Sequence, residues 1–310
     1  MQYQKVPVNL LLKQLGWTQM NMILHKAALT ATITSLATSA VADMAEVNGA
    51  NLYYEQIGSG PAILMMHGGL GLSHDYLRPY FDALSDTYTI VYYDHFGNGR
   101  SDKPDDYADM DFARLISDAD ALMTTLGHDT FTLIGHSYGG FIAQEFALSH
   151  QDRLDGMILV GTAPVLDYSP SIGGSVEQMM AFARLLSEPM ADDADFQATW
   201  FPVFQSYFHE WDDEVGADLD ARTVYEHRAW NVATSLLGTF NVLDKLPSVT
   251  IPTLVTSGRH DTVTPPELGA TRFNAAIPGS HIFIFENSGH YPFIEEEEMF
   301  FAVLREWLTL

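Results

Sequence analysis

From Asn51 onward, short apolar segments rich in β-branched and aromatic residues alternate with segments that carry apolar residues at helical spacing. This alternation is typical of βα units, which build a mostly parallel sheet with helices on its faces. We therefore predict an α/β fold with strands at residues 52–56, 62–67, 89–93, 131–135, 157–160, 253–256 and 281–285. Helices are predicted at residues 112–126, ending before Gly127, and at residues 138–150.

The alternation breaks between about Leu166 and Leu246, where the sequence becomes helical, aromatic and acidic. A stretch of this length without a convincing strand is too long for a loop inside a compact domain. We predict that residues 166–247 form a helical cap, inserted into a core made of residues 47–165 and 248–310.

The chain is strongly acidic, because 40 Asp and Glu residues against 15 Lys and Arg residues give a formal net charge of -25. Such a charge repels phosphate backbones and anionic lipid headgroups, so we expect neither nucleic acid nor a membrane as a partner. The absence of cysteine excludes disulfides, a thiol nucleophile and Cys-based metal sites. The pairs His74-Asp75 and Asp94-His95 lack the spacing of metal sites, so no metal is expected. The oligomeric state stays open.

The N-terminal segment indicates export. His25 and Lys26 precede an apolar stretch of small residues from Ala27 to Val41, which ends in Ala40-Val41-Ala42. This arrangement is typical of a secretory signal peptide with an Ala-x-Ala cleavage site. We predict a leader over residues 1–42, cleavage after Ala42 and a periplasmic or secreted protein. A leader without this function, on a cytoplasmic protein, is the alternative.

Ser137 lies in the run Gly135-His136-Ser137-Tyr138-Gly139-Gly140, between a predicted strand and a predicted helix. In that context a G-x-S-x-G pattern indicates a nucleophile elbow, a turn so tight that the flanking residues must lack bulk. The N-terminus of the following helix also directs free N–H groups toward charge that develops beside the serine. Ser137 is therefore the predicted nucleophile.

A serine hydroxyl needs an imidazole base that is itself oriented by a carboxylate. Downstream of Ser137, Gly258-Arg259-His260-Asp261 follows one predicted strand and Asn287-Ser288-Gly289-His290 follows the next. We predict Asp261 as the acid and His290 as the base. His260 is a weaker candidate, because it would place base and acid side by side on one loop.

A glycine-rich loop, His67-Gly68-Gly69-Leu70-Gly71, directly follows an earlier predicted strand. Backbone N–H groups of such a loop, together with that of the residue after the nucleophile, can hold an oxyanion. We predict Gly69 and Tyr138 as the two donors, with Leu70 as the alternative to Gly69. Nearby, Asp94 and Ser101 are expected to stabilise a turn, and Glu295 to Glu298 to open the last helix.

Three segments make the chain resemble the proline iminopeptidase (prolyl aminopeptidase) group of the α/β-hydrolase fold, namely residues 67–76, 93–102 and 135–140. The first resembles the group's His-Gly-Gly-Pro-Gly loop, and the second its Asp-x-x-Gly-x-Gly-x-Ser turn. Two positions depart from the group's pattern. Leu70 stands where the peptidases usually have proline, and His136 stands where they often have glycine. Gly-His-Ser is shared with esterases, lactonases and C–C hydrolases of the same fold.

The resemblance implies a serine hydrolase that needs no cofactor and releases N-terminal proline, or another N-terminal residue, from short peptides through an acyl-enzyme. Iminopeptidases hold the amino terminus of the substrate with acidic cap residues, since a desolvated ammonium needs a paired carboxylate. Glu226 is the preferred candidate and Glu210 the second, with Trp230 beside Glu226 as a contact for a proline ring. The alternatives are a carboxylesterase or lactonase with the same triad, acting on a small molecule, and a non-catalytic ligand-binding protein on this scaffold.

Overall fold

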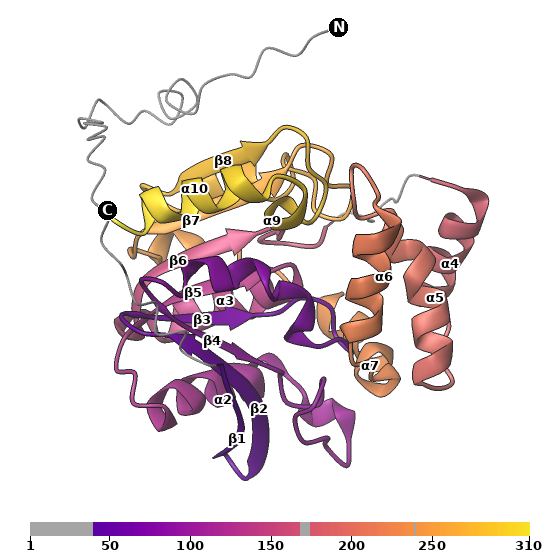
Figure 1. Cartoon of the computed structure of the whole chain (residues 1–310), viewed down its shortest axis with the longest axis horizontal. Coiled ribbons are helices and arrows are strands. Elements are labelled where there is room, and N and C mark those ends of the chain that lie inside the picture. Colours follow the sequence, from indigo (N-terminus) through magenta and orange to yellow (C-terminus); the bar gives the residue numbers. More distant parts are fainter. Residues whose placement is uncertain (1–39, 168–173, 239) are drawn as a thin grey trace, which may run out of the picture. The chain divides into compact units, whose positions relative to one another are not determined.

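The central element is an eight-stranded sheet within the part of the chain that the structure describes (Figure 1). This computed structural model describes residues 40–167, 174–238 and 240–310, and for residues 233–237 only the backbone. The strands are β1 (Val41–Val47), β2 (Ala50–Gly58), β3 (Ala62–Met66), β4 (Thr89–Tyr93), β5 (Phe131–His136), β6 (Leu154–Val160), β7 (Thr253–Gly258) and β8 (His281–Phe285). Their order is β1-β2-β4-β3-β5-β6-β7-β8.

The sheet is mostly parallel, as predicted. β1 pairs antiparallel with β2, and β2 antiparallel with β4, whereas all neighbours from β4 to β8 run parallel. The carboxyl ends of these parallel strands therefore meet at one edge, where loops that follow different strands can converge on a single site.

β1 was not among the predicted strands, because its first residues overlap the apolar stretch that the sequence assigned to a leader. Val41 and Ala42 pair with Gln56 and Glu55 of β2. The rest of the predicted leader lies outside the described residues, so cleavage after Ala42 and export stay predictions. Within the described residues, no helix combines the length and the apolar character needed to cross a bilayer.

Helices and 3-10 turns cover both faces of the sheet. One face packs against α2 (Phe112–Thr125), α3 (Tyr138–Ser149) and α8 (Ala270–Ala276). The other face packs against η3 (Tyr80–Leu84), α9 (Pro292–Glu295) and α10 (Glu297–Trp307). The other 3-10 turns in the described part of the chain are η2 (His74–Leu77), η4 (Tyr107–Asp109), η5 (Gln151–Arg153) and η6 (Leu246–Ser248).

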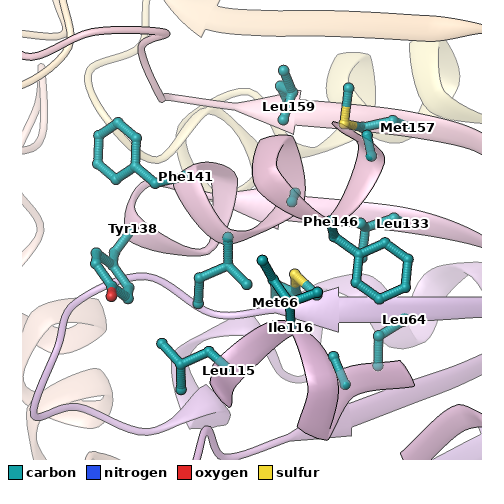
Figure 2. Packing of buried hydrophobic residues seen from close by; sticks show 14 of the residues in the cluster. Leu64, Met66, Leu115, Ile116, Leu133, Tyr138, Phe141, Phe146, Met157 and Leu159 are labelled. Carbon is teal, nitrogen blue, oxygen red and sulfur yellow. The ribbon is translucent and has the colours of Figure 1, made fainter. Parts of the chain in front are cut away.

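The alternating side chains of the strands explain this two-sided core. Leu64 and Met66 of β3 belong to the cluster that includes Leu115 of α2 and Phe146 of α3 (Figure 2). Their neighbour Met65 is also fully buried but points to the opposite face, because successive residues of a strand alternate. Burial on both faces holds the loops at the carboxyl edge on a rigid support.

Among the described residues, four helices follow β6 in the chain and precede β7, and we call them the cap helices. They are α4 (Val176–Ser187), α5 (Asp193–Gln205), α6 (Asp213–Arg222) and α7 (His227–Leu237), which gather beside the carboxyl ends of the strands (Figure 1). An isolated β-bridge joins Val165 to Asn241, where the chain leaves and re-enters the core. The exact limits of a cap at residues 166 and 247 stay a prediction.

Candidate active site

Ser137 sits at the junction between β5 and α3, with φ of 52° and ψ of -118°. A positive φ at a residue with a side chain is strained and persists only where the surroundings impose it. A Cβ on Gly139 would lie 2.0 Å from the carbonyl oxygen of Met66, and one on Gly135 would lie 2.6 Å from that of Gly139. The two glycines of the G-x-S-x-G pattern are therefore required by close backbone approach, and the predicted elbow geometry is present.

Asp261 follows β7 and His290 follows β8, and their side chains meet although 29 positions separate them. Nδ1 of His290 lies 2.8 Å from Oδ2 of Asp261, and both residues are buried. Asp261 also accepts hydrogen bonds from the N–H groups of Val263 and Thr264, both at 2.9 Å, and from the Thr264 hydroxyl at 2.8 Å. Burial alone would raise the pKa of Asp261, but His290 and these donors outweigh it and hold the pKa below its ordinary value.

The ionised Asp261 fixes the tautomer of His290. A carboxylate only accepts hydrogen bonds, so Nδ1 of His290 carries the proton and Nε2 keeps its lone pair. Nε2 is buried and has no hydrogen-bond partner among the described residues. An imidazole nitrogen in this state can accept a proton from a serine hydroxyl.

The loop that carries His290 is held by the cap segment and by Glu295. The N–H of His290 donates to the carbonyl of Tyr207 at 2.7 Å. Glu295 accepts from the N–H groups of Gly289 at 2.7 Å, His209 at 2.7 Å and Glu210 at 3.0 Å. Glu295 was predicted to open the last helix, but it ends α9 and its carboxylate joins two loops instead.

Helix α10 begins at Glu297 with Glu296 as its N-cap residue, so Glu296, Glu297 and Glu298 fulfil the prediction for the last helix. His260, the weaker candidate base, is exposed, and its ring stacks on that of His209 with centroids 3.6 Å apart. It takes no part in the pair formed by Asp261 and His290.

The glycine-rich loop passes directly over the serine. A Cβ on Gly68 would lie 2.7 Å from Cβ of Ser137, so only glycine fits there. Gly69, Leu70 and Tyr138 line the same cavity as Ser137. Their N–H groups donate no hydrogen bond within the described part of the chain. These groups can hold an oxyanion, and the choice of Gly69 over Leu70 stays a prediction.

Asp94 anchors the turn on the far side of this loop, as predicted. It accepts from the N–H groups of His74 at 2.9 Å and Arg100 at 2.7 Å, while the Ser101 hydroxyl donates to its carbonyl at 2.6 Å. Nδ1 of His74 lies 2.7 Å from the Asp94 carboxylate, so this histidine is already engaged.

A cavity of about 140 Å³ opens beside Ser137, and its wall is almost entirely aliphatic and aromatic. The core side contributes Gly68, Gly69, Leu70, Leu72, Tyr76, His136, Tyr138, Phe141, Val263, Thr264 and Tyr291, and the chain between β6 and β7 contributes Leu166, Phe182, Leu186, Trp200, Tyr207 and Trp230. This wall contains no Asp, Glu, Lys or Arg. Every Asp and Glu of the chain lies within the described residues, so no undescribed side chain can supply a carboxylate.

Of the three predicted cap residues, the structure brings only Trp230 to the cavity. Glu226 is buried, but its carboxylate is paired with Arg228, which donates to it from Nε at 2.8 Å and from an Nη atom at 2.9 Å. Burial alone would raise the pKa of Glu226, and Arg228 outweighs it and keeps the pKa low. Glu210 is exposed and also absent from the wall. Trp230 stacks on Phe196 at 5.3 Å and donates from Nε1 to the carbonyl of Leu185.

Sequence reasoning missed most of the cavity wall. Tyr76 lies within the first of the three family-like segments and was given no role, although its residue type and position were visible. Trp200 and Tyr207 were noted only as part of an aromatic segment. Which of these rings face a cavity depends on how the cap helices pack, and no spacing in the sequence states it.

One group of three donor residues among those described could hold a metal, namely Asp193, Glu226 and His227, whose donor atoms lie within 4.8 Å of one another. Glu226 is paired with Arg228, and Nδ1 of His227 lies 2.6 Å from Asp193. The donors are thus already engaged with protein partners.

Comparison with known proteins places the chain in a family. Residues 61–297 match the family described as alpha/beta hydrolase fold. A proline iminopeptidase from Saccharolobus solfataricus is 29% identical over 279 residues, which cover 84% of this chain and 89% of that protein. The predicted resemblance to the proline iminopeptidase group is thereby confirmed.

Solved structures agree on the fold. An esterase from Exiguobacterium antarcticum superposes with a TM-score of 0.74 at 25% identity, covering 87% of this chain and 100% of that one. An enol-lactonase from Burkholderia xenovorans gives a TM-score of 0.71 at 24% identity, covering 86% and 100%. With the sheet order, the elbow and the family match in agreement, the chain belongs to the alpha/beta hydrolase family.

Proposed function

We propose that this protein is a serine hydrolase that cleaves esters or lactones with a neutral, apolar acyl group. The observation that carries the proposal is the cavity wall beside Ser137, which is apolar and contains no carboxylate. A substrate with a free amino terminus would have to bury its ammonium there without a counter-ion, which is strongly unfavourable. A neutral acyl group gains free energy from the same surface.

The reaction begins when Oγ of Ser137 attacks the carbonyl carbon of the substrate and passes its proton to Nε2 of His290. Asp261 holds Nδ1–H and stabilises the imidazolium that forms. The N–H groups of Gly69 and Tyr138 stabilise the tetrahedral oxyanion. As the intermediate collapses, the leaving alkoxide takes the proton from His290. Water then attacks the acyl-enzyme by the same steps and releases the carboxylic acid and free Ser137.

A second candidate is removal of N-terminal proline from peptides. It is favoured by the similarity to a proline iminopeptidase at 29% identity over most of both chains. It also needs a carboxylate for the substrate amine, and the two predicted ones, Glu226 and Glu210, lie elsewhere.

Two anilides of equal ring size separate these candidates. Proline 4-nitroanilide carries the amine, and cyclopentanecarboxylic acid 4-nitroanilide lacks it but has the same shape and leaving group. A 4-nitrophenyl ester of the second acid measures the proposed ester activity. We expect ester turnover, with kcat/KM for the neutral anilide at least equal to that for the prolyl anilide.

A preference of more than about tenfold for the prolyl anilide would overturn the ester proposal in favour of the peptidase, since it exceeds the error of such comparisons. Folded protein that neither hydrolyses the ester nor reacts with a fluorophosphonate would overturn both, and would leave the ligand-binding alternative.

A further inference from the structure

A chain of hydrogen bonds crosses the floor of the cavity and joins three loops. The N–H of Gly68 donates to Oη of Tyr76 at 2.7 Å. Oη of Tyr76 lies 2.6 Å from Nδ1 of His136, and Nε2 of His136 lies 3.1 Å from the carbonyl oxygen of His290. These residues are all buried. The bridge thus runs from the glycine-rich loop, through the residue before the nucleophile, to the loop of the proposed base.

The chemistry of the groups determines which one donates and which one accepts in each hydrogen bond of this bridge. A carbonyl oxygen only accepts, so Nε2 of His136 must carry a proton. Burial lowers the pKa of His136 well below its ordinary value, so the ring is neutral and Nδ1 is an acceptor. The Tyr76 hydroxyl therefore donates to Nδ1, and its oxygen lone pair accepts from Gly68. No member of the bridge can rotate without leaving a buried polar group unpaired.

Aromatic packing holds the His136 ring in this orientation. Its centroid lies 4.9 Å from that of His290, 5.1 Å from Tyr291 and 5.2 Å from Phe293. Tyr76 packs against Tyr291 and Phe293 as well. The bridge is therefore both hydrogen-bonded and closely packed, as a device that fixes distances requires.

We propose that Tyr76 and His136 are positioning residues, which set the oxyanion loop and the base His290 at a fixed distance across Ser137. The Tyr76 hydroxyl anchors the N–H of Gly68, in the peptide group that directly precedes the one carrying the Gly69 N–H. His136 holds the main chain of His290 from the other side. A glycine at position 136, as the iminopeptidases often have, could make neither bond.

This inference rests on the proposed function, and Tyr76→Phe tests it by removing one hydroxyl while keeping the ring in the cavity wall. We expect kcat for the 4-nitrophenyl ester to fall about 10- to 100-fold, because displaced reacting groups cost rate in this range. KM should change less than about threefold, since the apolar wall is intact. Affinity for an alkyl boronic acid, whose adduct on Ser137 mimics the tetrahedral intermediate, should fall in parallel with kcat.

Rates are normalised to the sites that a fluorophosphonate labels at completion, so that loss of folded protein does not count as loss of kcat. Tyr92→Phe is the matched control, because the buried Tyr92 donates a comparable hydrogen bond from Oη to the Asp82 carboxylate at 2.8 Å and lies outside the cavity wall. We expect it to lower Tm about as much as Tyr76→Phe and to leave kcat unchanged. His136→Gln, which can keep a donor to His290, should lose less kcat than His136→Ala and serves if Tyr76→Phe does not fold.

The inference would be overturned if the wild-type enzyme is active and both Tyr76→Phe and His136→Ala keep kcat per labelled site within about threefold of the wild-type value. Inactive wild type would instead contradict the proposed function. In that case hydrogen exchange at the Gly68 N–H tests the bridge alone. We expect slow exchange that accelerates in Tyr76→Phe relative to Tyr92→Phe, and equal rates in the two variants would overturn the bridge.

Discussion

The two walls of the cavity are held together by different kinds of interaction. On the core wall, polar groups are joined by directional hydrogen bonds, such as the 2.6 Å contact between Oη of Tyr76 and Nδ1 of His136. On the cap wall, aromatic rings contact one another, as Trp200 and Trp230 do with centroids 5.9 Å apart. Hydrogen bonds fix positions within tenths of an ångström, whereas apolar packing tolerates changes of shape at constant volume. The core wall therefore suits chemistry, and the cap wall suits selection of the acyl group.

The two walls are also connected. The carbonyl of Tyr207, in the segment after α5, accepts from the N–H of His290, and Glu295 binds backbone on both sides of the junction. If the core wall carries the chemistry and the cap wall selects the acyl group, changes on the core wall should lower kcat for every substrate. Changes on the cap wall should alter the ranking of substrates.

The largest effect is expected for Ser137→Ala. Removal of the nucleophile should lower kcat by about 10⁶-fold and abolish fluorophosphonate labelling, because the remaining donors cannot form an acyl-enzyme. Binding of the unreacted ester, measured by calorimetry, should persist because the apolar wall is unchanged. Residual turnover above about 1% of wild type would show that another group attacks the substrate.

Asp261→Asn should come next, with a fall in kcat of about 10⁴-fold, since the amide favours the wrong tautomer of His290. The acyl-group ranking should not change. In the wild type, the lowered pKa of Asp261 keeps the carboxylate ionised at pH values where an ordinary aspartate begins to take up its proton. Its contribution to activity and stability should thus be present at neutral pH and be lost only as the pH falls through the lowered pKa. A loss of kcat in Asp261→Asn below about tenfold would contradict the orienting role.

A smaller effect, and of a different kind, is expected on the cap wall. Leu186 lines the cavity and is 51% exposed, so Leu186→Ala enlarges the site at little cost in stability. We expect kcat/KM for longer acyl chains to rise relative to acetate by about 3- to 30-fold, the value of one or two methylene contacts. The test is a series of 4-nitrophenyl esters from acetate to octanoate. An equal fall in kcat/KM for all chain lengths would contradict the assignment of acyl-group selection to the cap wall.

The smallest effect on activity is expected for Glu226→Gln, with Glu210→Gln as its exposed control. Ester kcat/KM should stay within about twofold of wild type for both, because neither carboxylate lies in the wall. Only Glu226→Gln should be less stable, by about 1–2 kcal/mol, since Arg228 loses a charge-assisted partner. The folded pKa of Glu226 is lowered, so this difference is present above the unfolded pKa and disappears as the pH falls through the folded one.

Loss of prolyl anilide turnover in Glu226→Gln, with ester turnover intact, would show amine recognition by this residue. That result would favour the peptidase candidate over the ester hydrolase.

Parts of the fold and of the candidate site could be predicted because short-range rules encode them. The parallel strands follow from apolar runs of strand length, and all seven predicted strands are present. β1 was missed because Val41 and Ala42 belong equally well to an apolar leader and to an edge strand. Glu295 was misassigned because a carboxylate near a helix end suits either a helix dipole or a loop clamp. Only the loops packed around it decide between the two.

By itself, the sequence determined the nucleophile elbow. The tight turn at Ser137 needs Gly135 and Gly139 because backbone lies within 3 Å of each absent Cβ, and that requirement is written into adjacent residues. Only the tertiary structure decided that Glu226 turns to Arg228, that Trp230 faces the cavity and that Tyr76 reaches His136. The physical reason is that the direction of a side chain and its hydrogen-bond partner depend on elements packed together from distant parts of the chain, which local sequence rules do not reach.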